Sequence, residues 1–186
     1  MHHLPCSGSP FRFAPPTGNP LSLPLPHSAD ISEILSHIPH RYPLILIDRM
    51  EACEPGQWVR VIKNVSAQEW FFAGVPAERR VMPQLLVVEA LAQSSGALCY
   101  YSGYFDRVAK PIVFFAGIDQ CRFGREARPG DQLVLDCKLV RHMRDVVKVS
   151  GRASIDGETA VELLLTAVIR DMDLSAAAQV AERGRK

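Results

Sequence analysis

One carboxylate in this chain stands where an apolar helix is expected. Glu89 lies in the middle of a hydrophobic run, and its nearest neighbours are Val87, Val88, Ala90 and Leu91. Burying a carboxylate costs several kcal/mol unless the group is paired or protonated, and burial raises its pKa toward the range useful for proton transfer. Glu89 is therefore a candidate general acid or base. The alternative is a structural carboxylate at a wet dimer seam or bonded to nearby backbone, with Gln93 as a partner one turn along.

The helix that carries Glu89 is predicted to run from Pro83 to about Gly103. Proline suits a first helical position, and glycine suits the end of a helix. Apolar side chains on all sides indicate that this helix is buried. A second, short helix is predicted to begin after Asp30 as N-cap and to stop by Pro39.

Strand-like segments account for most of the remaining chain. They are rich in β-branched or alternating apolar residues and are separated by turn pairs such as Asp156-Gly157. The predicted strands are 44–47, 58–65, 112–115, 132–140, 146–155 and 159–169. One buried helix embraced by an antiparallel sheet of about five or six strands is an α+β fold.

The composition limits the classes of protein to which the chain can belong. Its 186 residues suit one domain, and a formal net charge of +1 gives no global field to attract nucleic acid. No apolar run reaches the length of about eighteen residues that a membrane span needs. The five cysteines include no C-x-x-C pair, which favours reduced thiols in the cytoplasm and no metal site. No phosphate loop or dinucleotide fingerprint is present, so no cofactor is expected.

Both ends of the chain are predicted to lie outside the folded domain. Residues 1–29 are rich in proline, with Arg12 as their one charged residue, and are predicted to form a disordered leader. The tail 171–186 is alanine-rich and then basic, and is predicted to be flexible. A single domain is expected at 30–170.

Several segments of the chain closely resemble, in order, the (3R)-hydroxyacyl-[acyl carrier protein] dehydratases of fatty-acid synthesis. They are Pro39-His40-Arg41-Tyr42-Pro43, Ile47-Asp48-Arg49, Phe71-Phe72, Val81-Met82-Pro83, Glu89-Ala90-Leu91-Ala92-Gln93, Phe114-Phe115-Ala116-Gly117-Ile118-Asp119 and Pro129-Gly130-Asp131. The match runs from about Ile31 to Ile169. The resemblance implies a hotdog fold, in which one long buried helix is wrapped by an antiparallel sheet. It also implies a homodimer, a heterodimer with a paralogue or a higher assembly of such dimers.

The family's reaction, as the resemblance implies it, removes water from a 3-hydroxyacyl thioester held on acyl carrier protein. A histidine takes the C2 proton, and the helix carboxylate of the other subunit protonates the departing hydroxyl. A backbone N–H at the helix N-terminus polarises the thioester carbonyl. The resemblance places Glu89 at the carboxylate position and Gln84 at the polarising N–H. It places Gly74, Val75 and Val81 beside the substrate.

Three positions depart from the family's pattern. Val75 stands where the family has the histidine of Gly-His-Phe-Pro, Arg80 where it has a proline, and Gln84 where it has a glycine. No histidine lies between His40 and His142, so no shift of the alignment restores the base. Loss of a general base typically costs about 10²–10⁴-fold in rate. The histidines considered as replacements are His37, His40 and His142, and for His40 a structural role is the expectation.

Three functions remain open from the sequence. The first is a dehydratase or hydratase that acts on carrier-bound thioesters and relies on Glu89. The second is a non-catalytic or half-site subunit that offers Glu89 to the histidine of a paralogue. The third is an acyl thioesterase in which Glu89 attacks the thioester or activates water and the Gln84 N–H binds the carbonyl.

A cluster of arginines is the predicted docking site for the carrier. Acyl carrier protein is acidic, so a basic rim beside the site is expected if it is the partner. Arg122, Arg125 and Arg128 follow the Ala-Gly-Ile-Asp motif and are the predicted docking residues. Ordinary solvated surface charge is the alternative for all three.

Overall fold

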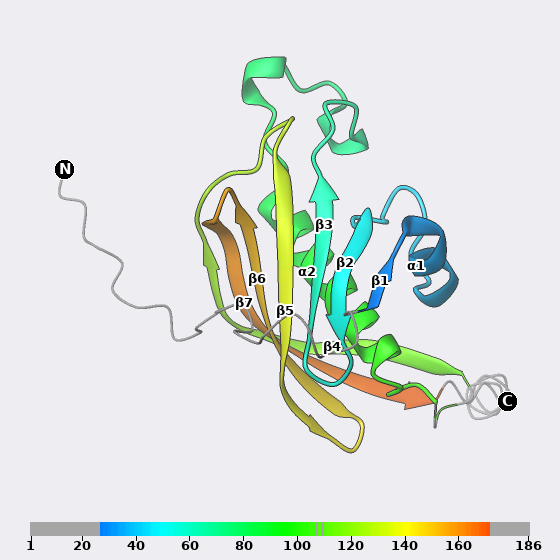
Figure 1. Ribbon diagram of the computed structural model, residues 1–186. Coiled ribbons are helices and arrows are strands. Elements are labelled where there is room, and N and C mark those ends of the chain that lie inside the picture. The colour runs from blue at the N-terminus through cyan, green and yellow to red at the C-terminus, as the bar shows by residue number, and fades with distance from the viewer. Residues whose placement is uncertain (1–26, 107, 109, 172–186) are drawn as a thin grey trace, which may run out of the picture.

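The computed structural model describes residues 27–106, 108 and 110–171 and consists of one curved sheet around one long helix. Its elements are β1 (His27–Ala29), α1 (Ile31–His37), β2 (Arg49–Glu54), β3 (Trp58–Asn64), two 3-10 turns (Trp70–Phe72 and Ala77–Arg79), α2 (Gln84–Tyr101), β4 (Pro111–Phe123), β5 (Gln132–Met143), β6 (Val146–Ile155) and β7 (Glu158–Asp171). The seven strands are paired antiparallel in the order β1-β2-β3-β5-β6-β7-β4. The sheet curls around α2 (Figure 1). This confirms the predicted α+β architecture.

Helix α2 forms the centre of the hydrophobic core. Leu91 and Leu98 are completely buried, and burial of a leucine side chain contributes about 1.5–3 kcal/mol. Gly151 of β6 allows the close packing, because a Cβ there would lie 3.1 Å from Leu163 and 3.4 Å from Leu91. No helix in the described part of the chain is long and apolar enough to cross a bilayer.

The predicted strand at 44–47 is wrong. These residues form no ladder, and β2 begins only at Arg49. The run is apolar because Leu46 and Ile47 are core residues. The backbone N–H of Leu46 donates to the side chain of Gln93 on α2 at 2.9 Å, which replaces a strand partner. Period and composition alone do not distinguish such a segment from a short buried strand.

The remaining predicted strands correspond to β3 to β7, most of them with different limits, and β2 was not predicted. β6 has the predicted bounds, and the buried side chains of Leu133, Leu135 and Cys137 on β5 confirm the predicted alternation. β4 is much longer than 112–115, because its pairing with β7 continues past two irregularities in register.

The folded region begins before the predicted boundary at residue 30. His27–Ala29 forms β1 and pairs with β2, so the prediction of a disordered leader is wrong for these three residues. At the other end, β7 continues through Asp171. The rest of the predicted leader, 1–26, and of the predicted tail, 172–186, lies outside the described residues.

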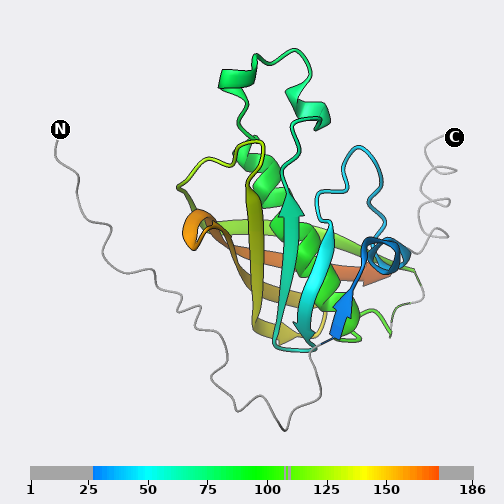
Figure 2. The ribbon, with the colours of Figure 1, turned by 45° about the horizontal axis from the view of Figure 1, so that its top comes forward.

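The segment 65–83, which joins β3 to α2, projects beyond the ends of the strands in both views (Figures 1 and 2). We call this segment the arm. Its base is fixed by Lys63 at the end of β3, whose side chain is only 6% exposed and donates to the Glu69 carboxylate. The same ammonium lies 3.9 Å from Asp48. The arm is therefore anchored by a largely buried ion pair.

Candidate functional site

Glu89 lies on a stripe of α2 that is partly exposed toward both ends of the helix and is interrupted by the buried Ala92. Leu85, Glu89, Gly96 and Tyr100 follow one another at helical spacing, and none of them is fully buried. We call these four residues the open stripe. The Glu89 side chain is 34% exposed, so a substrate can reach its carboxylate. The predicted helix is buried as expected, but the predicted burial of Glu89 is only partial.

The carboxylate of Glu89 is held by two side chains. Its Oε1 accepts a hydrogen bond from Gln93 Nε2 at 2.9 Å and lies 3.4 Å from His40 Nε2. Gln93 also donates to the Leu44 carbonyl at 2.7 Å and accepts from the Leu46 N–H at 2.9 Å. Gln93 therefore ties the loop after α1 to α2, and its predicted pairing with Glu89 is confirmed.

Arg41 fixes the backbone that presents His40. Its guanidinium donates to the carbonyl oxygens of Ile38 and His40 at 2.8 Å and of Leu35 at 2.9 Å. The carbonyls at a helix C-terminus lack partners inside the helix, and Arg41 supplies one for the end of α1. Two residues of the Pro39–Pro43 motif thus have different roles: Arg41 holds the loop, and His40 faces Glu89.

The environment of Glu89 favours its charged form. Burial acts to raise the pKa of Glu89, but the hydrogen bonds from His40 and Gln93 and the charge of His40 act against burial, and the pKa lies below its ordinary value. The predicted rise in pKa is therefore wrong. The reason is that Glu89 is only partly buried and accepts bonds that stabilise the carboxylate. At neutral pH Glu89 is ionised.

The lowered pKa of Glu89 predicts a pH-dependent contribution to stability. Because the folded pKa lies below the unfolded value of 4.5, this contribution is fully present above pH 4.5 and is lost as the pH falls through the folded pKa. Urea unfolding of the wild type and of Glu89→Gln from about pH 7 to about pH 3 measures it. The advantage of the wild type in free energy of unfolding should shrink toward acid, and an advantage that is constant with pH would contradict the assignment.

The predicted substrate-binding residues lie along the arm and at the start of α2. Gln84 is the first residue of α2, so its N–H has no acceptor within the helix. Val75 and Val81 are half-buried, and Gly74 is exposed with a φ of +75°, a conformation that glycine favours. Glu89 follows Gln84 by five residues, or about 7.5 Å along the helix axis.

Arg80 stabilises the arm from within. Its Nε donates to the Val75 carbonyl at 3.1 Å, and its Nη1 donates to the Ala67 carbonyl at 3.2 Å. A proline, which the resemblance predicts at this position, can make neither bond. Two of the three departures from the family's pattern, Arg80 and Val75, are thus bonded to one another.

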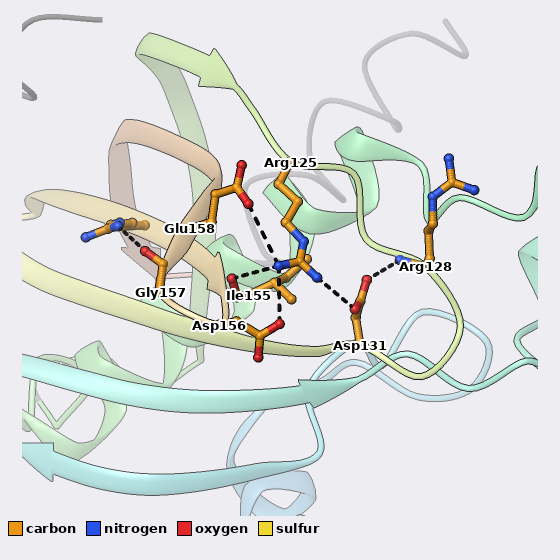
Figure 3. Close-up of polar contacts among 8 residues, drawn as sticks. Arg125, Arg128, Asp131, Ile155, Asp156, Gly157 and Glu158 are labelled. Atoms are coloured by element: carbon orange, nitrogen blue, oxygen red, sulfur yellow. Dashed lines mark hydrogen bonds and ion pairs between the residues drawn. The ribbon is translucent and has the colours of Figure 1, made fainter.

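Arg125, one of the three predicted docking residues, is occupied by a structural network. Its guanidinium lies 3.2 Å from Asp131, 3.2 Å from Asp156 and 3.8 Å from Glu158 (Figure 3). It also donates to the Ile155 carbonyl at 3.4 Å. Arg125 therefore joins the loop after β4 to the β6–β7 turn.

Arg122 and Arg128 are more accessible than Arg125. The Arg128 side chain points away from the network in Figure 3 and pairs with the exposed Glu126 at 2.9 Å. Arg122 is exposed on β4. The loop that follows lies beside the start of α2, because the Met82 N–H donates to the Ala127 carbonyl at 2.8 Å.

The four cysteines that the structure describes are poor nucleophiles. Burial raises the pKa of Cys53 to about 11 and the pKa values of Cys99 and Cys137 to about 12, and it also raises the pKa of Cys121. Thiols with such pKa values are protonated at neutral pH. Among the described residues, no group of three or more His, Cys, Asp and Glu could hold a metal ion.

Comparison with known proteins identifies the family. The FabA-like domain family matches residues 38–163. The 3-hydroxyacyl-[acyl-carrier-protein] dehydratase FabZ of Dechloromonas aromatica is 43% identical over 145 residues, which cover 77% of this chain and 99% of that protein. The chain belongs to the FabA-like dehydratase family. The FabZ of Thiobacillus denitrificans is a further relative, 40% identical over 142 residues that cover 76% of this chain and 98% of that protein.

Solved structures similar to this chain show its fold. A chain of the dehydratase heterocomplex ApeI:P from Xenorhabdus doucetiae has a TM-score of 0.65 and 16% identity, with 80% of this chain and 96% of that chain covered. A hot-dog-like protein from Thermanaerovibrio acidaminovorans has a TM-score of 0.54 and 18% identity, with coverage of 70% and 93%. The hotdog fold is thereby confirmed.

His40 lies closer to the site than its sequence motif indicates. A structural role is the expectation for this residue, and its Nε2 lies 3.4 Å from Glu89 Oε1. The only available signal was its place in the Pro39–Pro43 motif. No helical or strand period connects that motif to α2, because the contact depends on the irregular loop that Gln93 and Arg41 hold.

Proposed function

We propose that this protein removes water from 3-hydroxyacyl thioesters held on acyl carrier protein and so forms the enoyl thioester. Its curated relatives are named as dehydratases of that substrate class and match most of the chain. The observation that carries the proposal is the ionised, accessible Glu89 on the open stripe, a short distance along α2 from the Gln84 N–H. Such a helix N-terminus favours the negative charge that develops on a thioester oxygen.

A small apolar hollow lies beside the open stripe. It is lined by Ser95, Gly96 and Cys99 of α2, Val113 and Phe115 of β4, and Val147, Val149, Leu165 and Ala167 of the sheet. Gly96 lies about two turns beyond Glu89 on the same stripe, and a Cβ there would meet nothing within 4 Å. The hollow holds only about 10 Å³ in the single chain, so an acyl chain with its C3 hydroxyl at Glu89 would have to displace the side chains that line it.

A second subunit is proposed to bind at β4. This strand is an edge of the sheet, and its side chains Phe114, Phe115, Ile118 and Phe123 are between 43% and 55% exposed. Exposed apolar residues on an open strand edge are a ready site for pairing with another chain. The partner is a second copy or a paralogue.

A half-site role in a heterodimer is the second candidate function. Val75 stands where the resemblance predicts the general base, and the arm around it remains well bonded through Arg80. One protein of similar fold comes from a dehydratase heterocomplex. In this function Glu89 would complete a site that contains a histidine of the paralogue.

Product analysis separates these functions. The purified chain is incubated alone with a 3-hydroxyacyl-carrier thioester, and the hydroxyacyl, enoyl and free-acid species are resolved by mass spectrometry. Enoyl product is expected. No product from the chain alone, followed by activity after co-expression with a histidine-bearing paralogue, would favour the half-site role, and free acid would indicate the third function, a thioesterase.

The exposed arginines predict how the carrier docks. Arg122→Glu combined with Arg128→Glu should weaken carrier binding and reduce its salt dependence, because the acidic carrier would lose its complementary charge. Arg49→Glu, on the distant strand β2, is the control. The dissociation constant is measured by calorimetry at two salt concentrations. Unchanged affinity in the double variant would exclude these residues from docking, and Arg125 is not altered because its network is structural.

We infer that the protein works in the cytoplasm. The four described cysteines are all free thiols. Reducing compartments keep thiols in this state, whereas exported proteins commonly pair them.

A further inference from the structure

His40 contains the only buried side-chain polar atom in the described part of the chain that has no hydrogen-bond partner, its Nδ1. A buried N–H without an acceptor is rarer in proteins than a buried lone pair without a donor. The proton of a neutral His40 ring is therefore assigned to Nε2, the nitrogen 3.4 Å from Glu89 Oε1. In this tautomer His40 donates toward the carboxylate and has no free lone pair at Nε2 with which to act as a base.

The two oxygens of Glu89 have different surroundings. Oε1 faces the two donors, Gln93 Nε2 and His40 Nε2. Within the described residues, Oε2 accepts no hydrogen bond from a side chain or from backbone. The side chains of Glu89 and His40 are each about one-third exposed. Oε2 is thus the oxygen that is free to meet a substrate.

We propose that Glu89 performs both proton transfers of the dehydration, and that His40 of the same subunit is the positioning residue that keeps this carboxylate ionised and oriented. The inference rests on the proposed dehydratase function. It explains how elimination proceeds in a chain whose arm contains no histidine.

One carboxylate is sufficient for both proton transfers of the reaction. Glu89 Oε2 takes the proton from C2, the electrons of that C–H bond form the C2–C3 double bond, and the C3–O bond breaks. The carboxyl group then delivers the same proton to the departing hydroxyl, so water leaves and the carboxylate is restored. One group reaches both positions only when the hydrogen and the hydroxyl leave from the same face of the substrate, so the elimination is syn.

No other charged group of the surrounding loop replaces His40. The Arg41 guanidinium is directed to the carbonyls at the end of α1. Asp48 accepts from the Asn64 N–H and faces Lys63. Of the groups packed near this part of α2, His40 is the titratable one that acts on Glu89, with Gln93 as its neutral companion.

Two variants of similar polarity test the role of His40. Asparagine at this position is too short to reach Glu89, whereas glutamine can present an N–H to it. His40→Asn should raise the Glu89 pKa, as measured by ¹³C NMR of the carboxyl group, and move the acidic limb of the kcat profile to higher pH. It should also lower kcat by about 10–100-fold, the loss of one hydrogen bond to a charged group. His40→Gln should bring the Glu89 pKa, the acidic limb and kcat back toward the wild-type values.

The outcomes distinguish the inference from the proposed function. If His40→Asn leaves the Glu89 pKa and the acidic limb unchanged while the wild type forms enoyl product, the role of His40 is overturned and the function stands. If the wild type forms no enoyl product, the function fails, and the NMR titration still decides whether His40 acts on Glu89. Substrates deuterated at either C2 position test the single carboxylate: loss of the label anti to the hydroxyl would overturn it.

Discussion

Replacing Glu89 with glutamine should reduce enoyl formation by at least about 10²–10⁴-fold, the usual contribution of general acid–base catalysis. The amide has the size of the carboxylate, and its oxygen can still accept from Gln93 Nε2, as Glu89 Oε1 does at 2.9 Å. The loss should therefore fall on chemistry and leave the fold intact. Steady-state kcat/KM with a carrier-bound substrate measures the loss, and thermal unfolding checks the fold.

The matched control for this substitution is Glu51→Gln. Glu51 is an exposed carboxylate on β2 that pairs with Arg49 at 2.8 Å, outside the open stripe. Its substitution should leave kcat/KM unchanged. Full activity in Glu89→Gln would remove the carboxylate from the reaction and with it the proposed chemistry.

Replacing Glu69 with alanine should be among the most destabilising changes in the chain. It leaves the ammonium of Lys63, which is 6% exposed, without its closest partner. Breaking a buried pair on one side costs about 3–5 kcal/mol, and the lower end is expected because Asp48 remains 3.9 Å away. Urea unfolding measures the change in free energy.

A double substitution separates the lost pair from lost packing. Lys63→Met combined with Glu69→Leu removes both charges and keeps apolar volume, so it should be close to neutral. If Glu69→Ala costs no more than that double variant, the ion pair does not anchor the arm. The arm lies directly before α2, so loss of this anchor should also lower activity.

The main features of the fold were predictable from periodicity and composition. The burial of α2 follows from apolar residues on all its sides, β5 follows from alternation that matches one covered face, and β6 follows from its strand-like composition next to a turn pair. The segment around Leu46 was not predictable, because a buried irregular loop and a short strand share one composition and only the side chain of Gln93 distinguishes them. The length of β4 depends on its pairing with β7 and has no local signal.

The candidate site was predictable in its residues and less so in its electrostatics. A glutamate in an apolar helix identified Glu89, and the resemblance to a family identified the helix N-terminus beside it. The lowered pKa of Glu89 was not predictable, because it depends on a contact with His40 across an irregular loop. The ion pair of Arg125 with Asp156 was not predictable either, because Asp156 lies in a turn that is distant in the sequence.

The apolar edge of β4 has a consequence for how the protein behaves on dilution. The proposed pairing at β4 obeys mass action, so the subunits should separate once the total concentration drops below the dissociation constant of the pair, and any turnover that depends on the pair should fall with it. Assays at nanomolar enzyme would then underestimate the rate, and the curve of activity against enzyme concentration would bend upward. In a cell, synthesis of the two subunits in unequal amounts would leave the more abundant one with Phe114 and Phe115 uncovered.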